Sequence, residues 1–203
     1  MAILVSSHQF PLPDRIARDR GVRTVLFFLT GFLFWLLFAL QPIQAPAQPV
    51  SREYPLKAVF MLNFGRFTDW PADAFSSPDA PFIVGILGDN PFGQTMDETM
   101  GGEKIDRHKI LVEYYKNVAD IKDCNMLFIC QSEAGQARKI LTVLKTRPVL
   151  TVADFPNAAG NGVCVQFVTQ NNRIRFRINV SAVKDAHLTM SSELLRLADI
   201  VSR

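Results

Sequence analysis

The sequence predicts one α/β domain with a Rossmann-like, mainly parallel sheet, helices on both faces of that sheet, and a C-terminal antiparallel hairpin and helix. Two observations lead to this fold class. Between residues 82 and 154, apolar strand patterns alternate with helical patterns, which is typical of a parallel sheet covered on both sides. After residue 160 the pattern changes to two strands that flank a polar turn, which predicts a hairpin.

The first 47 residues have the order of a secretion signal. Four arginines precede an uncharged run at residues 24–40, and Ala45-Pro46-Ala47 fits the small-x-small rule for cleavage. We expect cleavage after Ala47, which leaves residues 48–203 as a single domain in the periplasm. The alternative is an uncleaved anchor in the inner membrane, because the 17-residue run is at the short end for a membrane span. The formal charge of the whole chain is +3, and no basic patch indicates a nucleic-acid partner.

The domain begins with a predicted helix over residues 56–67. No proline or β-branched run interrupts it, and Leu56, Val59, Phe60 and Phe67 share one apolar stripe. The apolar surface is wider than one core face needs. Phe64, which lies off the stripe, is therefore our candidate for an exposed partner-binding anchor. The alternative is that the chain's own terminus or loops cover this second face of the helix, as is common in α/β folds.

Four strands and two helices are predicted next. Residues 82–87 (FIVGIL) have the short apolar run of a buried strand, and Asn90 with Pro91 suits the start of a helix. A second helix is expected from Ser132 to Lys145, with its apolar residues at helical spacing. The other predicted strands cover residues 109–115, 125–130 and 148–154.

The predicted hairpin has one charged face. In its second strand, Arg173, Arg175 and Arg177 alternate with apolar residues, which is the pattern of a half-buried strand. This arginine row can bind a carboxylate or a phosphate, although a solvated surface explains it equally well. A last helix is expected from about Ser191, with an apolar face that consists of Leu194, Leu195, Leu197, Ala198 and Val201.

No catalytic constellation is present in the sequence. There is no HExxH, GxSxG or P-loop motif, and only two of the three histidines lie beyond the signal. We therefore expect no enzyme activity, no metal site and no cofactor. Asp154 follows a predicted strand and is a candidate site acid, because ligands gather at the carboxyl ends of such strands; an ordinary turn aspartate is the alternative.

Three cysteines follow the signal, and export would allow a disulfide. Cys124 and Cys130 are about 20 Å apart if they share a strand, so they cannot pair with each other. Either can pair with Cys164 if their strands are neighbours, and Cys130–Cys164 is the pairing that we favour. Three buried, inert thiols are the alternative.

Several segments together resemble the YfiR family of exported bacterial proteins. They are YPLKAVFMLNFGRFTDWP, GILGDNPFG, LTVAD and RFRINVSAVKDAHLTMSSELLRLA, in the order and spacing of that family. The resemblance covers residues 53–200 and implies a periplasmic Rossmann-like domain. It further implies a repressor that binds the periplasmic sensor domain of an inner-membrane diguanylate cyclase and so lowers cyclic di-GMP. Cys124 and Cys164 match cysteines that form disulfides in the family.

We therefore expect a binding protein rather than an enzyme. Its partner would be the periplasmic domain of a membrane-bound cyclase or a similar receptor, and it can also pair with itself through an exposed helix. The alternative is a sensor of a small periplasmic ligand, bound near the carboxyl ends of the strands. The predicted partner-binding residues are Phe60, Phe64, Phe67, Trp70, Arg173, Arg175 and Arg177.

Overall fold

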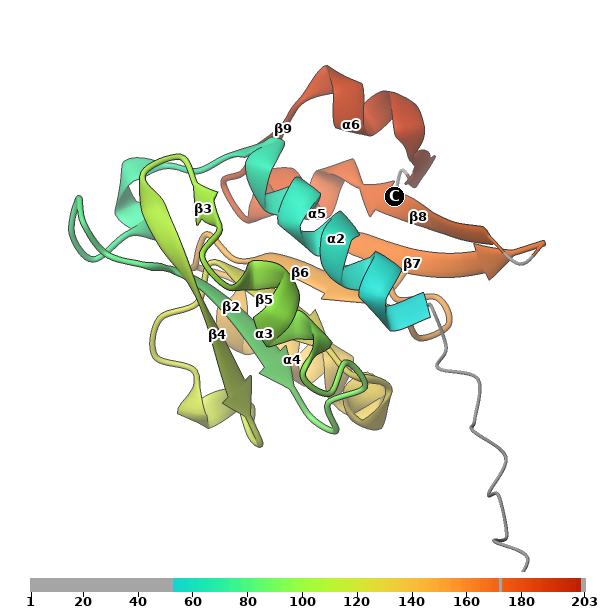
Figure 1. Ribbon diagram of the computed structural model, residues 1–203. Helices are drawn as coiled ribbons and strands as arrows, with labels where there is room; N and C mark the ends of the chain where they lie inside the picture. Colours follow the sequence, from blue (N-terminus) through green and yellow to red (C-terminus); the bar gives the residue numbers. More distant parts are fainter. Residues whose placement is uncertain (1–52, 172, 202–203) are drawn as a thin grey trace, which may run out of the picture. The chain divides into compact units, whose positions relative to one another are not determined.

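The computed structural model describes residues 53–171 and 173–201, so the predicted signal and its cleavage site lie outside the described residues. An eight-stranded sheet has the order β10-β8-β7-β6-β5-β2-β4-β3 (Figure 1). The five strands from β4 to β7 are parallel, β8 is antiparallel to β7, and β10 is parallel to β8. The strands are β2 (Phe82–Leu87), β3 (Lys104–Ile105), β4 (His108–Tyr115), β5 (Met126–Ile129), β6 (Leu150–Ala153), β7 (Val165–Gln170), β8 (Arg173–Asn179) and β10 (Asp199–Val201).

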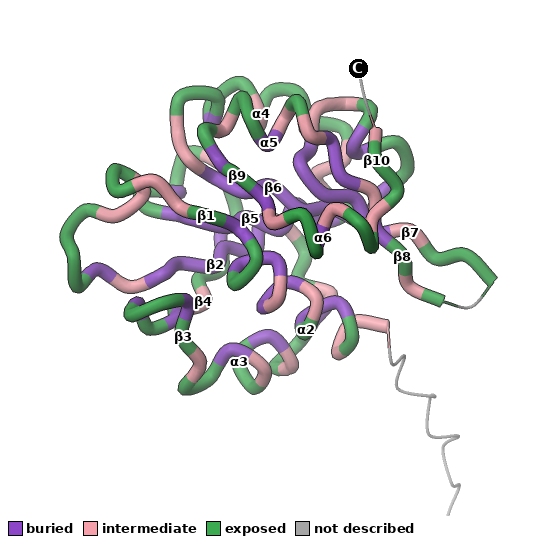
Figure 2. The backbone as a smooth tube through the Cα atoms, turned by 90° about the horizontal axis from the view of Figure 1, so that it is seen from above, coloured by how far each residue is buried: buried purple, intermediate pink, exposed green. Residues whose placement is uncertain are grey.

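Helices cover both faces of this sheet. Figure 2 shows α2 and α3 on one side and α4 and α5 on the other, as the sequence predicts for a doubly covered α/β fold. A small two-stranded sheet of β1 and β9 lies outside the large one. The remaining elements are α2 (Glu53–Arg66), β1 (Thr68–Asp69), η1 (Ala72–Ala74), α3 (Thr95–Met100), η2 (Val118–Asp120), η3 (Gln131–Gln136), α4 (Ala137–Leu144), α5 (Val180–Asp185), β9 (Thr189–Met190) and α6 (Ser192–Leu197).

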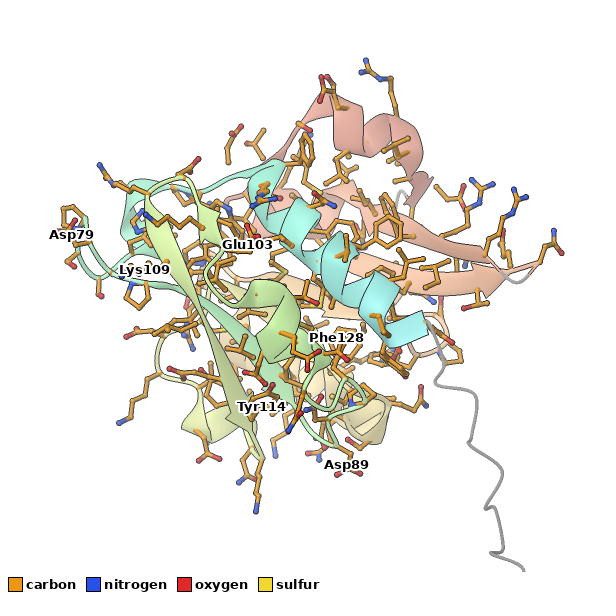
Figure 3. The ribbon with its side chains drawn as sticks, in the orientation of Figure 1. Asp79, Asp89, Glu103, Lys109, Tyr114 and Phe128 are labelled. Atoms are coloured by element: carbon orange, nitrogen blue, oxygen red, sulfur yellow. The ribbon has the colours of Figure 1, made fainter. Side chains whose placement is uncertain are left out.

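Both faces of the central strands are buried. Every residue of β2, β5 and β6 is buried, which explains why these strands are continuous apolar runs in the sequence. One core cluster includes side chains of α2, α3 and α6, and the other lies under α4. Phe128 belongs to the first cluster and meets Phe92 edge to face at a centroid distance of 4.8 Å (Figure 3).

Three local predictions need correction. Asn90 does not cap a helix, because its carboxamide oxygen accepts from the Phe92 N–H in a tight turn and α3 begins only at Thr95. Residues 131–136 form a 3₁₀ segment, so the α-helix predicted from Ser132 begins at Ala137. The last helix ends at Leu197, and β10 follows as an edge strand. In addition, α5 was not predicted at all.

The predicted hairpin is present as β7 and β8. Phe167 faces Phe176 across the pair, and Val165 faces Ile178.

None of the helices within the described ranges is both long enough and apolar enough to cross a membrane.

Candidate partner-binding surface

Helix α2 buries a different side from the one that the sequence predicts. Phe64 has no exposed surface, whereas Leu56 and Val59 of the predicted core stripe are each 45% exposed. The prediction that Phe64 is an exposed anchor is therefore wrong. The side of α2 that faces the core consists of Lys57, Ala58, Met61, Leu62, Phe64 and Gly65.

Small residues and aromatic rings explain this orientation. A Cβ atom added to Gly65 would lie 2.2 Å from Ile105 Cδ1, so the helix backbone packs directly against the tip of this buried side chain, which would have to shift to admit a larger residue. The Phe64 ring lies 5.5 Å from the Phe167 ring and 5.0 Å from the Phe176 ring, both in the hairpin strands. Close backbone approach and aromatic packing thus outweigh the burial of Leu56 and Val59.

A buried ion cluster fixes the amino-terminal part of α2. Lys57 is only 2% exposed, and its Nζ lies 2.6 Å from Asp154 Oδ2 and 2.7 Å from Glu53 Oε1. The Tyr54 hydroxyl donates to the same Asp154 oxygen at 3.2 Å. Burial and the nearby Asp154 carboxylate raise the pKa of Tyr54 above its ordinary value. Asp154, the candidate site acid, is thus occupied by groups of the chain's own first helix.

The opposite side of α2 is apolar and open to solvent. We call Leu56, Val59, Asn63 and Phe67, with the half-buried Phe60 between them, the outer stripe of α2. The Asn63 side-chain amide donates to the Val59 carbonyl at 3.0 Å, so its polar group is used within the helix. Because Lys57 and Phe64 hold the inner side in the core, Leu56, Val59 and Phe67 stay exposed.

The C-terminal elements add exposed apolar residues on the same side of the sheet. The Ser191 N–H donates to the Phe67 carbonyl at 2.9 Å, so α6 starts where α2 ends. Ser191 caps α6 as predicted, and Leu194 packs into the same core cluster as α2. Leu197 is 70% exposed and Ile200 in β10 is 51% exposed. The predicted apolar face of one long helix is therefore wrong in two respects: Leu197 is exposed, and Ala198 and Val201 lie beyond the end of α6.

The other predicted aromatic residue, Trp70, packs inside the molecule. Its indole N–H donates to the Gly65 carbonyl at 3.0 Å, and its ring meets Phe82 edge to face at 4.8 Å. Trp70 is half-buried, and it closes the end of α2 over the amino end of β2. Among the predicted aromatic partner-binding residues, Phe67 alone is exposed, with 39% of its surface open to solvent.

The arginine row lies on the other face of the sheet. Phe176 and Ile178 of β8 point into the cluster under α2, so the alternating Arg173, Arg175 and Arg177 point away from it. Arg173 and Arg175 are exposed and Arg177 is half-buried. The structure therefore separates the predicted residues into two surfaces, which one compact contact cannot cover together.

The predicted disulfide is also wrong. Strand β6 lies between β5 and β7, so Cys130 and Cys164 are not on neighbouring strands, and all three cysteines are free and buried. Burial raises the pKa of Cys124 and of Cys130 to about 12, and it raises that of Cys164 as well. Their burial in the core agrees with the alternative interpretation.

No group of three or more His, Cys, Asp or Glu side chains within residues 53–171 and 173–201 is placed to hold a metal ion. The exposed Asp89 lies just after the carboxyl end of β2 (Figure 3), and its backbone N–H donates to Ser132 Oγ at 3.0 Å. This hydrogen bond ties the loop after β2 to the 3₁₀ segment that follows β5.

The described residues form a Rossmann-like α/β domain whose helix α2 exposes apolar side chains. The model of the YfiR/HmsC-like family matches residues 54–199, and the chain belongs to this family. A comparison with curated proteins finds no match. At the level of the family, membership supports a periplasmic regulator of diguanylate cyclase activity rather than an enzyme.

Proposed function

We propose that the protein is a periplasmic negative regulator that binds the periplasmic sensor domain of an inner-membrane diguanylate cyclase and lowers cyclic di-GMP synthesis. Family membership supports the class of regulator. The observation that carries the proposal is the outer stripe of α2, an apolar surface on a helix whose other side is fixed in the core. Exposed apolar and aromatic residues of this kind form the centre of protein interfaces.

We place the contact on the outer stripe of α2, with Leu197 and Ile200 at its border. This keeps Phe60 and Phe67 of the predicted set and leaves out Phe64, which has no exposed surface. The arginine row faces away, so it would take part only if the partner reaches around the hairpin.

Two valine variants test the surface. Val59 in α2 and Val143 in α4 are both exposed valines in helices, 45% and 49% respectively. The two helices lie on opposite faces of the sheet (Figure 2). Val59→Asp should weaken binding to the cyclase domain by about 2 kcal/mol or more, which is roughly thirtyfold. The cell should then show raised cyclic di-GMP with normal abundance of the regulator.

Val143→Asp is the matched control and should leave binding and cyclic di-GMP unchanged. Both variants should keep their stability within about 0.5 kcal/mol, because both sites are exposed. Equal binding by Val59→Asp and the unmodified protein would reject the proposed surface. Sedimentation of the protein alone would show whether a second copy uses the same stripe, because Val59→Asp should then dissociate a dimer.

A further inference from the structure

A groove between α4 and α5 lies on the opposite face of the sheet from the outer stripe of α2. Its volume is about 440 Å³, within the range of about 300–1,000 Å³ that is typical of small-molecule sites. Its floor lies at the amino ends of β6 and β7, where the Cys164 N–H donates to Thr151 Oγ1 at 3.0 Å. The apolar lining consists of Leu141, Leu144, Val149, Cys164, Ala182 and Ala186.

The charged groups of this groove are mostly cationic. Arg138, Lys145 and Arg147 line it, against the single carboxylate of Asp185. Arg138 and Lys145 are seven residues apart, so they lie on one side of α4 with Leu141 between them. Within the described ranges, no carboxylate forms an ion pair with any of the three cations. Their combined field therefore favours an anion in the groove.

Arg147 is held in place before any ligand binds. Its guanidinium donates to the Ile121 carbonyl at 3.2 Å and to the Lys122 carbonyl at 2.6 Å. A guanidinium fixed by two acceptors loses little further side-chain entropy when it meets an anion, and its charge remains uncompensated by these neutral carbonyls.

The lining also limits the kind of anion. The residues that line the groove include no aromatic side chain, so no stacking platform for a nucleobase is present. An aliphatic floor with cations at the rim suits a compact hydrocarbon body with one acidic group. We propose that the α4–α5 groove binds a small organic carboxylate, with the carboxylate at Arg138, Lys145 and Arg147 and the hydrocarbon part over Leu144, Val149 and Cys164.

Titration with phenylacetate tests this proposal. Protein purified after expression of the full-length chain is labelled with ¹⁵N, and amide shifts are followed up to about 10 mM ligand, the weak end of specific binding. We expect saturable shifts at Gly160, Gly162, Ala182 and Ala186. The neutral phenylacetamide should bind at least about tenfold more weakly, because it lacks the charge that the three cations attract.

Two variants of α4 provide the comparison. Arg138→Glu should weaken phenylacetate binding at least about tenfold. Lys139→Glu makes the same change of charge one residue along, at an exposed position that does not line the groove, and should change binding less than about twofold. Ala186→Phe, which fills the groove, should abolish the shifts while the protein remains folded.

Three results would overturn the proposal: no saturable shifts, shifts confined to other parts of the domain, or equal weakening by Arg138→Glu and Lys139→Glu. Binding is measured on the protein without a cyclase. Failure here would therefore leave the proposed regulatory function untouched, and failure of that function would leave this result standing.

Discussion

Substitution of Phe64 by alanine is the most direct test of how α2 is oriented. Phe64 is fully buried, and its ring packs against Phe60, Phe167 and Phe176 at centroid distances of 6.2, 5.5 and 5.0 Å. Removal of such a ring costs the transfer free energy of its atoms and leaves a cavity that closes only partly. We expect Phe64→Ala to lower the free energy of unfolding by about 3–5 kcal/mol. For a domain of this size, that corresponds to a drop in Tm of about 6–20 °C.

Urea unfolding followed by Trp70 fluorescence measures this loss. Trp70 is the one tryptophan after residue 47 and packs against Phe82 in the core, so its emission reports unfolding. Val59→Ala on the outer stripe is the control and should change stability by less than about 0.5 kcal/mol. A loss below about 1 kcal/mol in Phe64→Ala, or a larger loss in Val59→Ala, would refute the orientation of the helix. Partner binding should fall in Phe64→Ala only as far as the folded population falls.

Two further predictions concern buried polar groups. Asp154→Asn removes the main partner of the buried Lys57 ammonium, so it should cost about 3–5 kcal/mol in chemical denaturation, whereas the double variant Lys57→Met, Asp154→Leu should recover much of that loss. All three thiols should resist labelling in the native protein and react after unfolding; a labelled native thiol would contradict their burial. Burial raises the pKa of Cys124 and Cys130 to about 12 in the folded protein, whereas these thiols lose their protons at about pH 8.5 in the unfolded chain. The contribution of both thiols to the free energy of unfolding should therefore be complete below about pH 8.5. It should decline as the pH rises from there toward 12, by up to about 1.4 kcal/mol per pH unit for each thiol.

The class of fold and most strands could be predicted from local patterns. Apolar runs such as Phe82–Leu87 mark buried parallel strands, and the alternation around Phe176 marks the half-buried hairpin. These signals are local. Alternating apolar residues indicate a strand that is buried on one face, and a continuous apolar run indicates burial on both faces. The capped start of α6 at Ser191 is local in the same way.

The orientation of α2 could not be predicted from its own periodicity. Helix α2 carries apolar side chains on both its buried and its exposed side, so the residues that pack against it decide which side is buried. Gly65 against Ile105 and Phe64 against the hairpin decide it, and both involve residues far away in the sequence. One signal was present, since Lys57 in an apolar helix indicates a buried partner such as Asp154, but the pairing spans 97 positions. The disulfide prediction failed for a related reason, because strand order is a property of the whole sheet.

The long span between α2 and its partners has a consequence for folding. Helix α2 is synthesised before the strands that it packs against. Lys57 pairs with Asp154 across a separation of 97 residues, and Phe64 can pack against Phe167 and Phe176 only after β7 and β8 have been synthesised. Until then its aromatic side has nothing to pack against, and contacts of such sequence separation are slow to form because a long loop must close. An unpaired apolar helix at the front of a growing chain is prone to aggregation. Chaperone dependence should therefore be greatest for chains that stop before residue 178, and it should fall sharply once the hairpin is complete.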